Sequence, residues 1–293
     1  RMATDLKYQY SRLNIAEKLI AINVAIFILV RLISALFGYN TVAFISWFEL
    51  PKDFFTFIKQ PWSIVTYSFL HGGFGHVFWN MLMLYFTGKI FMNLYGERKF
   101  INVYFLGVIF GGIIFLVSYN VFPALILSNS SLIGASAGVT AVLIFVCTYT
   151  PNQEVRVLFF NVKLWYVGAF FVLVDLIQIG GGENIGGRLA HLGGAFIGYY
   201  YARKLIGGTD IGEGFSQLID RISNLFRKDK KAPMKTVYRK PTSNLKKTLD
   251  YEKESQQRKV DIILDKISKS GYESLSKEEK DFLFKAANNF FFW

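Results

Sequence analysis

Long apolar runs with few charges constrain this chain more than any other feature of its sequence. The hydrocarbon core of a bilayer is about 30 Å thick, so one helical span needs about 20 mostly apolar residues. Six runs meet this requirement, at about 17–37, 75–95, 101–121, 132–149, 162–179 and 189–206. We therefore predict an all-α fold: a polytopic membrane protein built as a bundle of six helices.

Charged residues gather outside these runs and divide the chain into segments. We predict a cytoplasmic N-terminus at 1–16, a six-span domain at 17–207, a basic juxtamembrane linker at 208–250 and a small helical segment at 251–293. The single cysteine, Cys147, has no partner for an internal disulfide. The organisation is therefore one membrane domain followed by a polar tail.

Lysine and arginine are distributed unevenly over the predicted connections. They mark the N-terminus, the turns after spans two and four, and the tail, whereas residues 120–133 carry no charge. Cytoplasmic loops carry an excess of these residues, so both termini are predicted to lie in the cytoplasm of a protein in the cell membrane. An even number of spans gives the same result. The excess of lysine and arginine in the predicted cytoplasmic segments accounts for the net charge of +12, so no nucleic-acid partner is expected.

The tail combines a basic run with a short helical segment. Residues 227–247 contain nine lysines and arginines against one aspartate, a composition that is attracted to anionic lipid, with RNA as the minor alternative. Two short helices are predicted over 251–289, because Gly271 suits a helix stop and Ser276 and Glu279 have the spacing of a capping box. The expected apolar face consists of Leu264, Ile267, Phe282 and Leu283. This face gives too small a core for the segment 251–293 to fold stably alone. We therefore expect it to pack on a partner, which the sequence does not identify.

Polar side chains inside the predicted spans are the candidate functional residues, because such groups are costly in a bilayer. Spans two, four and six run in the same direction. His76, Ser136 and His191 each lie a few residues into one of them. At a rise of 1.5 Å per residue, all three fall within roughly 10 Å of the outer boundary. Asn80 lies one turn deeper than His76 on the same helix face, so we expect these four side chains to share one site.

Three further ionisable residues in or beside the spans have less specific interpretations. Asp175 in span five and Arg31 in span one are predicted to snorkel toward the membrane surface. His71 lies five residues before His76, a spacing that is poor for a pair of metal ligands. We therefore predict neither a metal site nor a cofactor.

Small residues recur at intervals of four in two of these spans. Gly134 and Gly138 do so in span four, and Ala190, Gly194 and Gly198 in span six. Such faces let membrane helices approach closely. Close approach is also what a nucleophile and its base need, since they must come within about 2.6–3.2 Å.

The order and spacing of these residues resemble the rhomboid family of intramembrane serine proteases. The resemblance covers roughly residues 10–206, and the six predicted spans match the family's topology. A Gly-x-Ser motif alone carries almost no information, whereas the combination is highly specific. The matching motifs are His71-x4-His76-x3-Asn80, Gly134-x-Ser136 and Ala190-His191-x2-Gly194.

The resemblance implies a role for each of these residues. Ser136 would be the nucleophile and His191 its general base, as a dyad without a carboxylate. His76, Asn80 and the backbone N–H of Ser136 would form the oxyanion hole. The family cuts transmembrane proteins near the outer membrane face. The structural residues near the site would be His71, Gly134, Gly138 and Gly194.

The sequence departs from the family's pattern at three positions. Ser63 stands where the family often has arginine, and Ala137 stands where glycine commonly follows the nucleophile. Thr140 stands where an aromatic residue often stacks on the catalytic histidine. The orientation of His191 therefore does not follow from the resemblance.

Three functions fit the candidate residues. The first is an intramembrane serine endopeptidase, a hydrolase whose partners are transmembrane protein substrates. The second is a catalytically silent relative that binds or escorts membrane proteins, although such relatives tend to lose the serine or the histidine. The third is a transporter or metal site that uses the three histidines, which the few acidic residues in the spans disfavour. The natural substrate, the cleavage site and the oligomeric state do not follow from the sequence.

Overall fold

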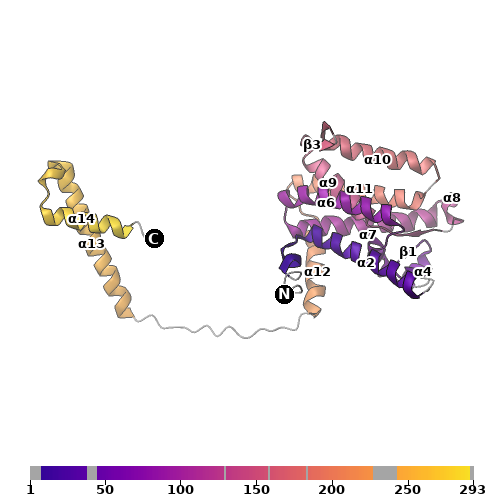
Figure 1. Ribbon diagram of the computed structural model, residues 1–293, viewed down its shortest axis with the longest axis horizontal. Helices are drawn as coiled ribbons and strands as arrows, with labels where there is room; N and C mark the ends of the chain where they lie inside the picture. The colour runs from indigo at the N-terminus through magenta and orange to yellow at the C-terminus, as the bar shows by residue number, and fades with distance from the viewer. Residues whose placement is uncertain are drawn as a thin grey trace. The chain divides into compact units, whose positions relative to one another are not determined.

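The structure of this chain is a computed structural model that describes residues 8–37, 45–128, 130–157, 159–182, 184–226 and 243–290. The chain divides into two compact units, Arg1–Lys228 and Asp229–Trp293, which are described separately below. Both units are mainly helical (Figure 1).

Each of the six predicted spans coincides with one long helix of the first unit. The helices are α2 (Ile15–Phe37), α6 (Phe74–Leu94), α7 (Glu97–Val121), α9 (Ser136–Tyr149), α10 (Leu164–Gly180) and α11 (Ile185–Ile206) (Figure 1). By length and composition, α2 and α7 are the two described helices that are long and apolar enough to cross a membrane. The helical fold is therefore confirmed, while a sixfold crossing stays a prediction.

Short elements fill the connections between these helices. The helical ones are α4 (Phe54–Lys59), α5 (Ser63–Thr66), η1 (Tyr67–Phe69) and α8 (Pro123–Ile126). Two antiparallel strand pairs correct the all-α prediction: β1 (Leu50–Pro51) with β2 (Ser131–Leu132), and β3 (Glu154–Val157) with β4 (Phe160–Lys163). In the first pair Leu50 lies opposite Leu132, which ties the connection before α4 to the residues just before α9.

Helix α9 forms the centre of the unit, and α6, α7, α10 and α11 pack against it. Ten of its fourteen residues are buried, which explains why the whole helix is apolar. Close packing on α11 relies on the predicted small residues. A Cβ at Gly194 would lie 2.1 Å from the carbonyl oxygen of Ala137, and one at Gly198 would lie 2.3 Å from that of Ala141.

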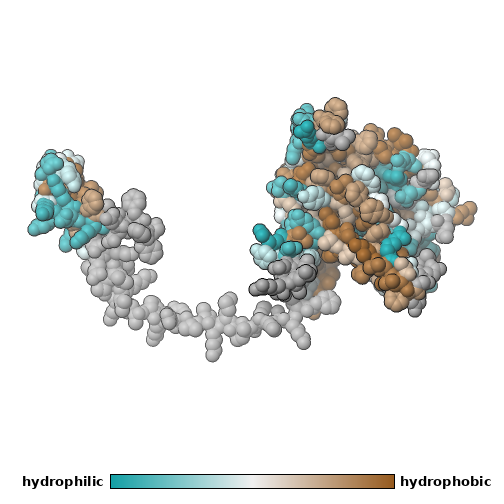
Figure 2. All heavy atoms as spheres, viewed as in Figure 1, coloured by the Kyte–Doolittle hydropathy of each residue, from teal (hydrophilic) through white to brown (hydrophobic). Residues whose placement is uncertain are grey.

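Apolar side chains cover much of the face of the first unit seen in Figure 2, with polar patches among them. Helix α2 is the extreme case, because it buries only Ala16, Leu19 and Asn23. Its exposed side chains include Leu29, which is 55% exposed, and Leu36, which is 74% exposed. Apolar side chains cover the outside of a helix bundle when lipid is the solvent. The surface therefore agrees with a membrane environment.

A helix absent from the sequence-based prediction occupies part of the expected linker 208–250. Helix α12 (Glu213–Phe226) packs on the start of α7. The amide of Asn102 donates to the carbonyl of Gly212 at 3.0 Å and to Ser216 Oγ at 2.8 Å. The linker prediction rested on local composition and did not anticipate these bonds to a distant helix. The basic run predicted at 227–247 lies mostly outside the described residues, which resume at 243.

The second unit contains α13 (Ser243–Ser270), η2 (Tyr272–Ser274) and α14 (Lys277–Phe290). The helix stop at Gly271 is confirmed, with φ of +78° and an N–H that donates to the carbonyl of Ile267. The capping box is also confirmed, since Ser276 N–H donates to Glu279 at 2.7 Å and Glu279 N–H donates to Ser276 Oγ at 3.2 Å.

The predicted apolar face of this unit is wrong at one position. Leu264 is 50% exposed, whereas its neighbour Ile263 is buried together with Leu275. Helix α13 begins at Ser243, earlier than the predicted boundary at 251. Local capping signals placed the turn correctly, but the face that α13 turns inward depends on its packing against η2 and α14.

Candidate active site

A cavity of about 440 Å³ between α6, α9, α10 and α11 brings the predicted polar residues together. Four different helices supply its walls, so no single segment of sequence contains the site. The polar side chains that line it are His76, Asn80, Ser136, Thr140, Asp175, Asn184, Arg188 and His191. The expectation that His76, Asn80, Ser136 and His191 share one site agrees with this cavity.

Ser136 occupies the first position of α9 and is half-buried. The helix begins here, four residues later than predicted, because Leu132 pairs with β1 and Gly134 has φ of +120°. Ser136 and His191 line the same cavity, and among the described residues no hydrogen bond joins them, since the side-chain bonds of His191 go to Asp175. The backbone N–H of Ser136 stands at a helix N-terminus, where N–H groups lack partners within the helix.

His191 is held from the side by Asp175. Its Nδ1 lies 3.1 Å from Asp175 Oδ1 and 3.2 Å from Oδ2. Arg188, one turn earlier on α11, donates from Nη1 to Asp175 Oδ1 at 2.9 Å. Asp175 is only 5% exposed.

The prediction that Asp175 snorkels to the membrane surface is therefore wrong. Its carboxylate turns inward because α11 offers it two donors, and a buried charge is stabilised by such partners. Arg188, on the neighbouring helix, is the cationic partner of this carboxylate.

His76 and Asn80 line the cavity from α6. The backbone N–H of Gly72 donates to His76 Nδ1 at 3.5 Å, which leaves Nε2 as the N–H donor of a neutral ring. Asn80 Nδ2 donates to the carbonyl of His76 at 2.9 Å, and its second N–H stays available. Both side chains can therefore present an N–H to an oxygen in the cavity.

Gly134 makes room for His76. Its φ of +120° is strained for any residue with a side chain, and a Cβ there would lie 2.6 Å from His76 Nε2. The structural role expected for Gly134 agrees with this geometry. Gly138 is likewise confined, since its Cβ would lie 2.8 Å from the ring of Tyr104.

His71 lies in the segment before α6, outside the long helices. Its ring packs edge-on against His76, with 5.1 Å between the centroids, and neither ring nitrogen has a hydrogen-bond partner among the described residues. Burial, followed by the nearby His76, lowers the pKa of His71 to about 4. This environment favours a neutral His71 side chain that packs against its neighbours.

Acidification should expose this role of His71. An unfolded chain binds a proton at His71 near pH 6.5, whereas the folded chain does so only near pH 4. The free energy of unfolding should therefore fall as pH drops from about 6.5 to 4, by up to about 3 kcal/mol. Thermal unfolding in detergent across this range should show a shallower decline for His71→Phe. Parallel curves for the variant and the wild type would contradict the assignment.

Arg31, also predicted to snorkel, turns to the protein instead. Its guanidinium donates from Nη2 to the carbonyl of Gly72 at 2.5 Å and lies 5.4 Å from the centre of the Phe27 ring. The bond to Gly72 is long-range, so local sequence did not reveal it. Arg31 thus ties α2 to the segment that positions His76.

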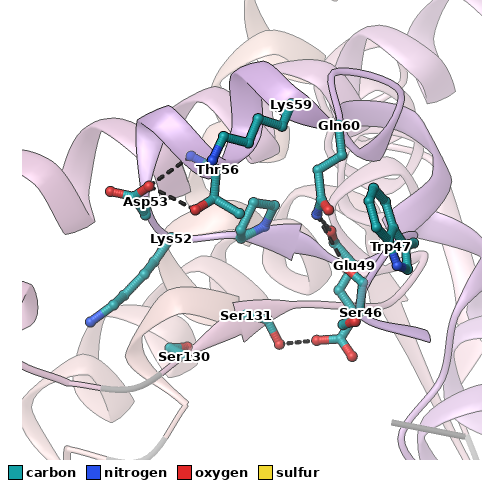
Figure 3. Close-up of a pocket in the computed structure, with 11 residues that line it drawn as sticks. Ser46, Trp47, Glu49, Lys52, Asp53, Thr56, Lys59, Gln60, Ser130 and Ser131 are labelled. Carbon is teal, nitrogen blue, oxygen red and sulfur yellow. Dashed lines mark hydrogen bonds between the residues drawn. The ribbon is translucent and has the colours of Figure 1, made fainter. Parts of the chain in front are cut away.

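A larger hollow of about 630 Å³ lies beside β1 and β2 (Figure 3). Several of its polar side chains form hydrogen bonds with the local backbone. Asp53 caps α4 by accepting from Thr56 at 2.7 Å, and Gln60 donates to two carbonyls at 3.1 Å. Glu49 bonds Ser131 across the strand pair (Figure 3). We therefore take the smaller cavity, which a serine and two histidines line, as the candidate active site.

Metal ligation has no candidate in the part of the chain that the structure describes. No group of three histidine, cysteine, aspartate or glutamate residues is arranged there to hold an ion. The sequence-based interpretation did not place Asp175 and Arg188 in this cavity, which both residues line. The available signal was a lone carboxylate within an apolar span, which by default indicates a functional site with a partner.

Comparison with known proteins gives two family matches. The Rhomboid domain matches residues 59–207, and a family of unknown function (DUF6576) matches residues 246–288. RHOMBOID-like protein 12, mitochondrial, of Arabidopsis thaliana is 26% identical over 191 residues, which cover 61% of this chain and 54% of that protein. Presenilin-associated rhomboid-like protein, mitochondrial, of Rattus norvegicus is 28% identical over 184 residues, 58% of this chain and 48% of that protein. The chain spans about half the length of these relatives.

Proposed function

The chain belongs to the rhomboid family of membrane proteins, and from this premise we propose that it is a serine endopeptidase that cuts transmembrane proteins within the membrane. The observation that carries the proposal is the shared cavity, in which Ser136 and His191 face two side-chain donors on α6. A serine becomes a nucleophile when an adjacent base takes its proton.

In the proposed mechanism, Ser136 Oγ attacks the carbonyl carbon of the peptide bond while His191 Nε2 accepts the hydroxyl proton. The carbonyl oxygen becomes an oxyanion that His76 Nε2–H, the Asn80 amide and the backbone N–H of Ser136 stabilise. The C–N bond then breaks as His191 returns the proton to the departing amine. Water, activated by His191, hydrolyses the acyl-enzyme and restores Ser136.

We further propose six membrane crossings, with both termini in the cytoplasm of a cell membrane. The six long helices and the asymmetric distribution of lysine and arginine support this orientation. The Ser136 end of α9 would then lie toward the outer face. The relatives named above are called mitochondrial, so reporter fusions at both termini should be tested in cells. A terminus outside the cytoplasm would contradict this topology.

The test of the function is cleavage of single-span membrane proteins by the purified chain in lipid bicelles. We expect two fragments whose new ends map by mass spectrometry to the outer quarter of the substrate span. A protein that escorts its clients would instead retain them uncut. Cleavage that a zinc chelator abolishes would favour the metal alternative.

The Gly134→Ala variant should lose activity because its Cβ would push His76 out of the oxyanion hole. A clash with Nε2 together with an unfavourable φ should reduce the rate of cleavage by about 10²–10³-fold, the size seen when one oxyanion donor is lost. The control is Gly73→Ala, because a Cβ at Gly73 meets nothing within 4 Å and the backbone there is extended. Equal rates for both variants would argue against His76 as a donor.

A further inference from the structure

We propose that Asp175 is a positioning residue for His191, so that a carboxylate from α10 completes the Ser136–His191 pair as a triad. The inference rests on the proposed function and deepens it. The resemblance to the family implied a dyad without a carboxylate, and the observed contacts point to a different arrangement.

The contacts fix the tautomer of His191. Both oxygens of Asp175 lie within 3.2 Å of Nδ1, and an ionised carboxylate only accepts hydrogen bonds. Nδ1 therefore carries the proton, and Nε2 is left with its lone pair. A general base that faces a serine needs that lone pair, so this carboxylate selects the productive form of the ring.

The contacts also fix the plane of the ring. None of the described aromatic rings stacks on His191, and the cavity wall on α9 offers Thr140, which has no ring. The His191 side chain keeps 17% of its surface exposed in a cavity of about 440 Å³. A ring so placed could turn about its side-chain bonds unless a fixed acceptor holds it. Asp175 supplies that acceptor from a different helix.

Arg188 holds the carboxylate in turn. It donates to Oδ1 at 2.9 Å, which leaves Oδ2 to His191 alone. A carboxylate that is 5% exposed is costly without such partners, and Arg188 offsets that cost. The alternative is that Asp175 and Arg188 form only a tie between α10 and α11. The two interpretations differ in which substitution harms catalysis more.

The experiment compares the full chain with Asp175→Asn, Asp175→Glu, Asp175→Ala and Arg188→Gln in the bicelle cleavage assay. We expect Asp175→Asn to lower kcat on the order of 10²–10⁴-fold with little change in KM, because the amide can donate to Nδ1 and favour the wrong tautomer. Asp175→Glu should recover part of the loss. Formate should raise the rate of Asp175→Ala in a concentration-dependent manner, since it can fill the vacated site.

The Arg188→Gln variant is the matched control, because it removes the tie between the helices but keeps the bond between Asp175 and His191. We expect its loss of kcat to be at least tenfold smaller than that of Asp175→Asn, at comparable thermal stability. Similar losses in both variants, or no rescue by formate, would overturn the positioning role. If the wild type cuts and Asp175→Asn cuts equally fast, this inference fails while the proposed function stands. An inert wild type overturns both.

Discussion

Replacing Ser136 with alanine is expected to abolish cleavage while leaving the capacity to bind a membrane-embedded substrate. The methyl group of alanine cannot form the acyl-enzyme, and His191 has no hydroxyl to deprotonate. We expect kcat to fall by about 10⁴-fold or more, to the level that solution hydrolysis and binding alone allow. The measurement is single-turnover cleavage of a fluorescent single-span substrate, together with co-purification of the uncut substrate.

The control for this variant is a serine elsewhere in the long helices of the first unit. Ser118 on α7 is 4% exposed and does not line the active-site cavity. Ser118→Ala should keep its rate within about twofold of the wild type, because the change removes one hydroxyl group that lies outside the cavity. A fluorophosphonate should label the wild type and Ser118→Ala but not Ser136→Ala. Residual cleavage by Ser136→Ala would indicate that another group is the nucleophile.

The sequence predicted the helices well because each apolar run is long enough to form a helix and is bounded by polar residues. All six runs became helices with shifts of a few residues at their ends. The larger shifts have one tertiary cause and one local cause. Helix α9 starts late because Leu132 pairs with Leu50, and α11 starts early because Asn184 accepts from Gly187 N–H and caps it. A strand pair between residues as far apart in sequence as Leu50 and Leu132 leaves no local signal.

The site was predictable as far as depth in the membrane could define it. His76, Ser136 and His191 have one predicted depth on spans predicted to run in the same direction, and they line one cavity. The predicted depth of a residue in the membrane does not indicate which side of its helix faces the protein. Asp175 faces inward because α10 presents that side to α11, which only the packing decides. The snorkelling prediction failed because it treated α10 as an isolated helix.

The same distinction applies to the second unit. The capping box at Ser276 and the stop at Gly271 are local, so sequence located them. The choice of Ile263 over Leu264 as the buried residue depends on contacts across the turn. Lys266, which bonds both oxygens of Glu279 at 2.9 Å, is one of those contacts. Without these contacts, the sequence does not tell which of two neighbouring apolar residues is buried.

Replacing Gly194 with alanine is expected to destabilise the first unit strongly, because it forces α9 and α11 apart. The new Cβ would lie 2.1 Å from the carbonyl oxygen of Ala137, and a backbone atom cannot move aside as a flexible side chain can. We expect a loss of about 3 kcal/mol or more in the free energy of unfolding. The melting temperature in detergent should fall by roughly 6–12 °C for a domain of this size.

The matched control is Gly214→Ala on α12, where a Cβ would meet nothing within 4 Å. Alanine is the better helix former by about 1 kcal/mol, so this variant should be as stable as the wild type or more so. Gly194→Ala should also reduce cleavage at temperatures where it is folded, because Ala137 adjoins Ser136 and a shift of 1 Å can lower a rate 10²-fold. If Gly194→Ala melts with the wild type and cuts equally fast, α9 and α11 do not depend on this contact. The serine and the histidine would then be positioned by other means.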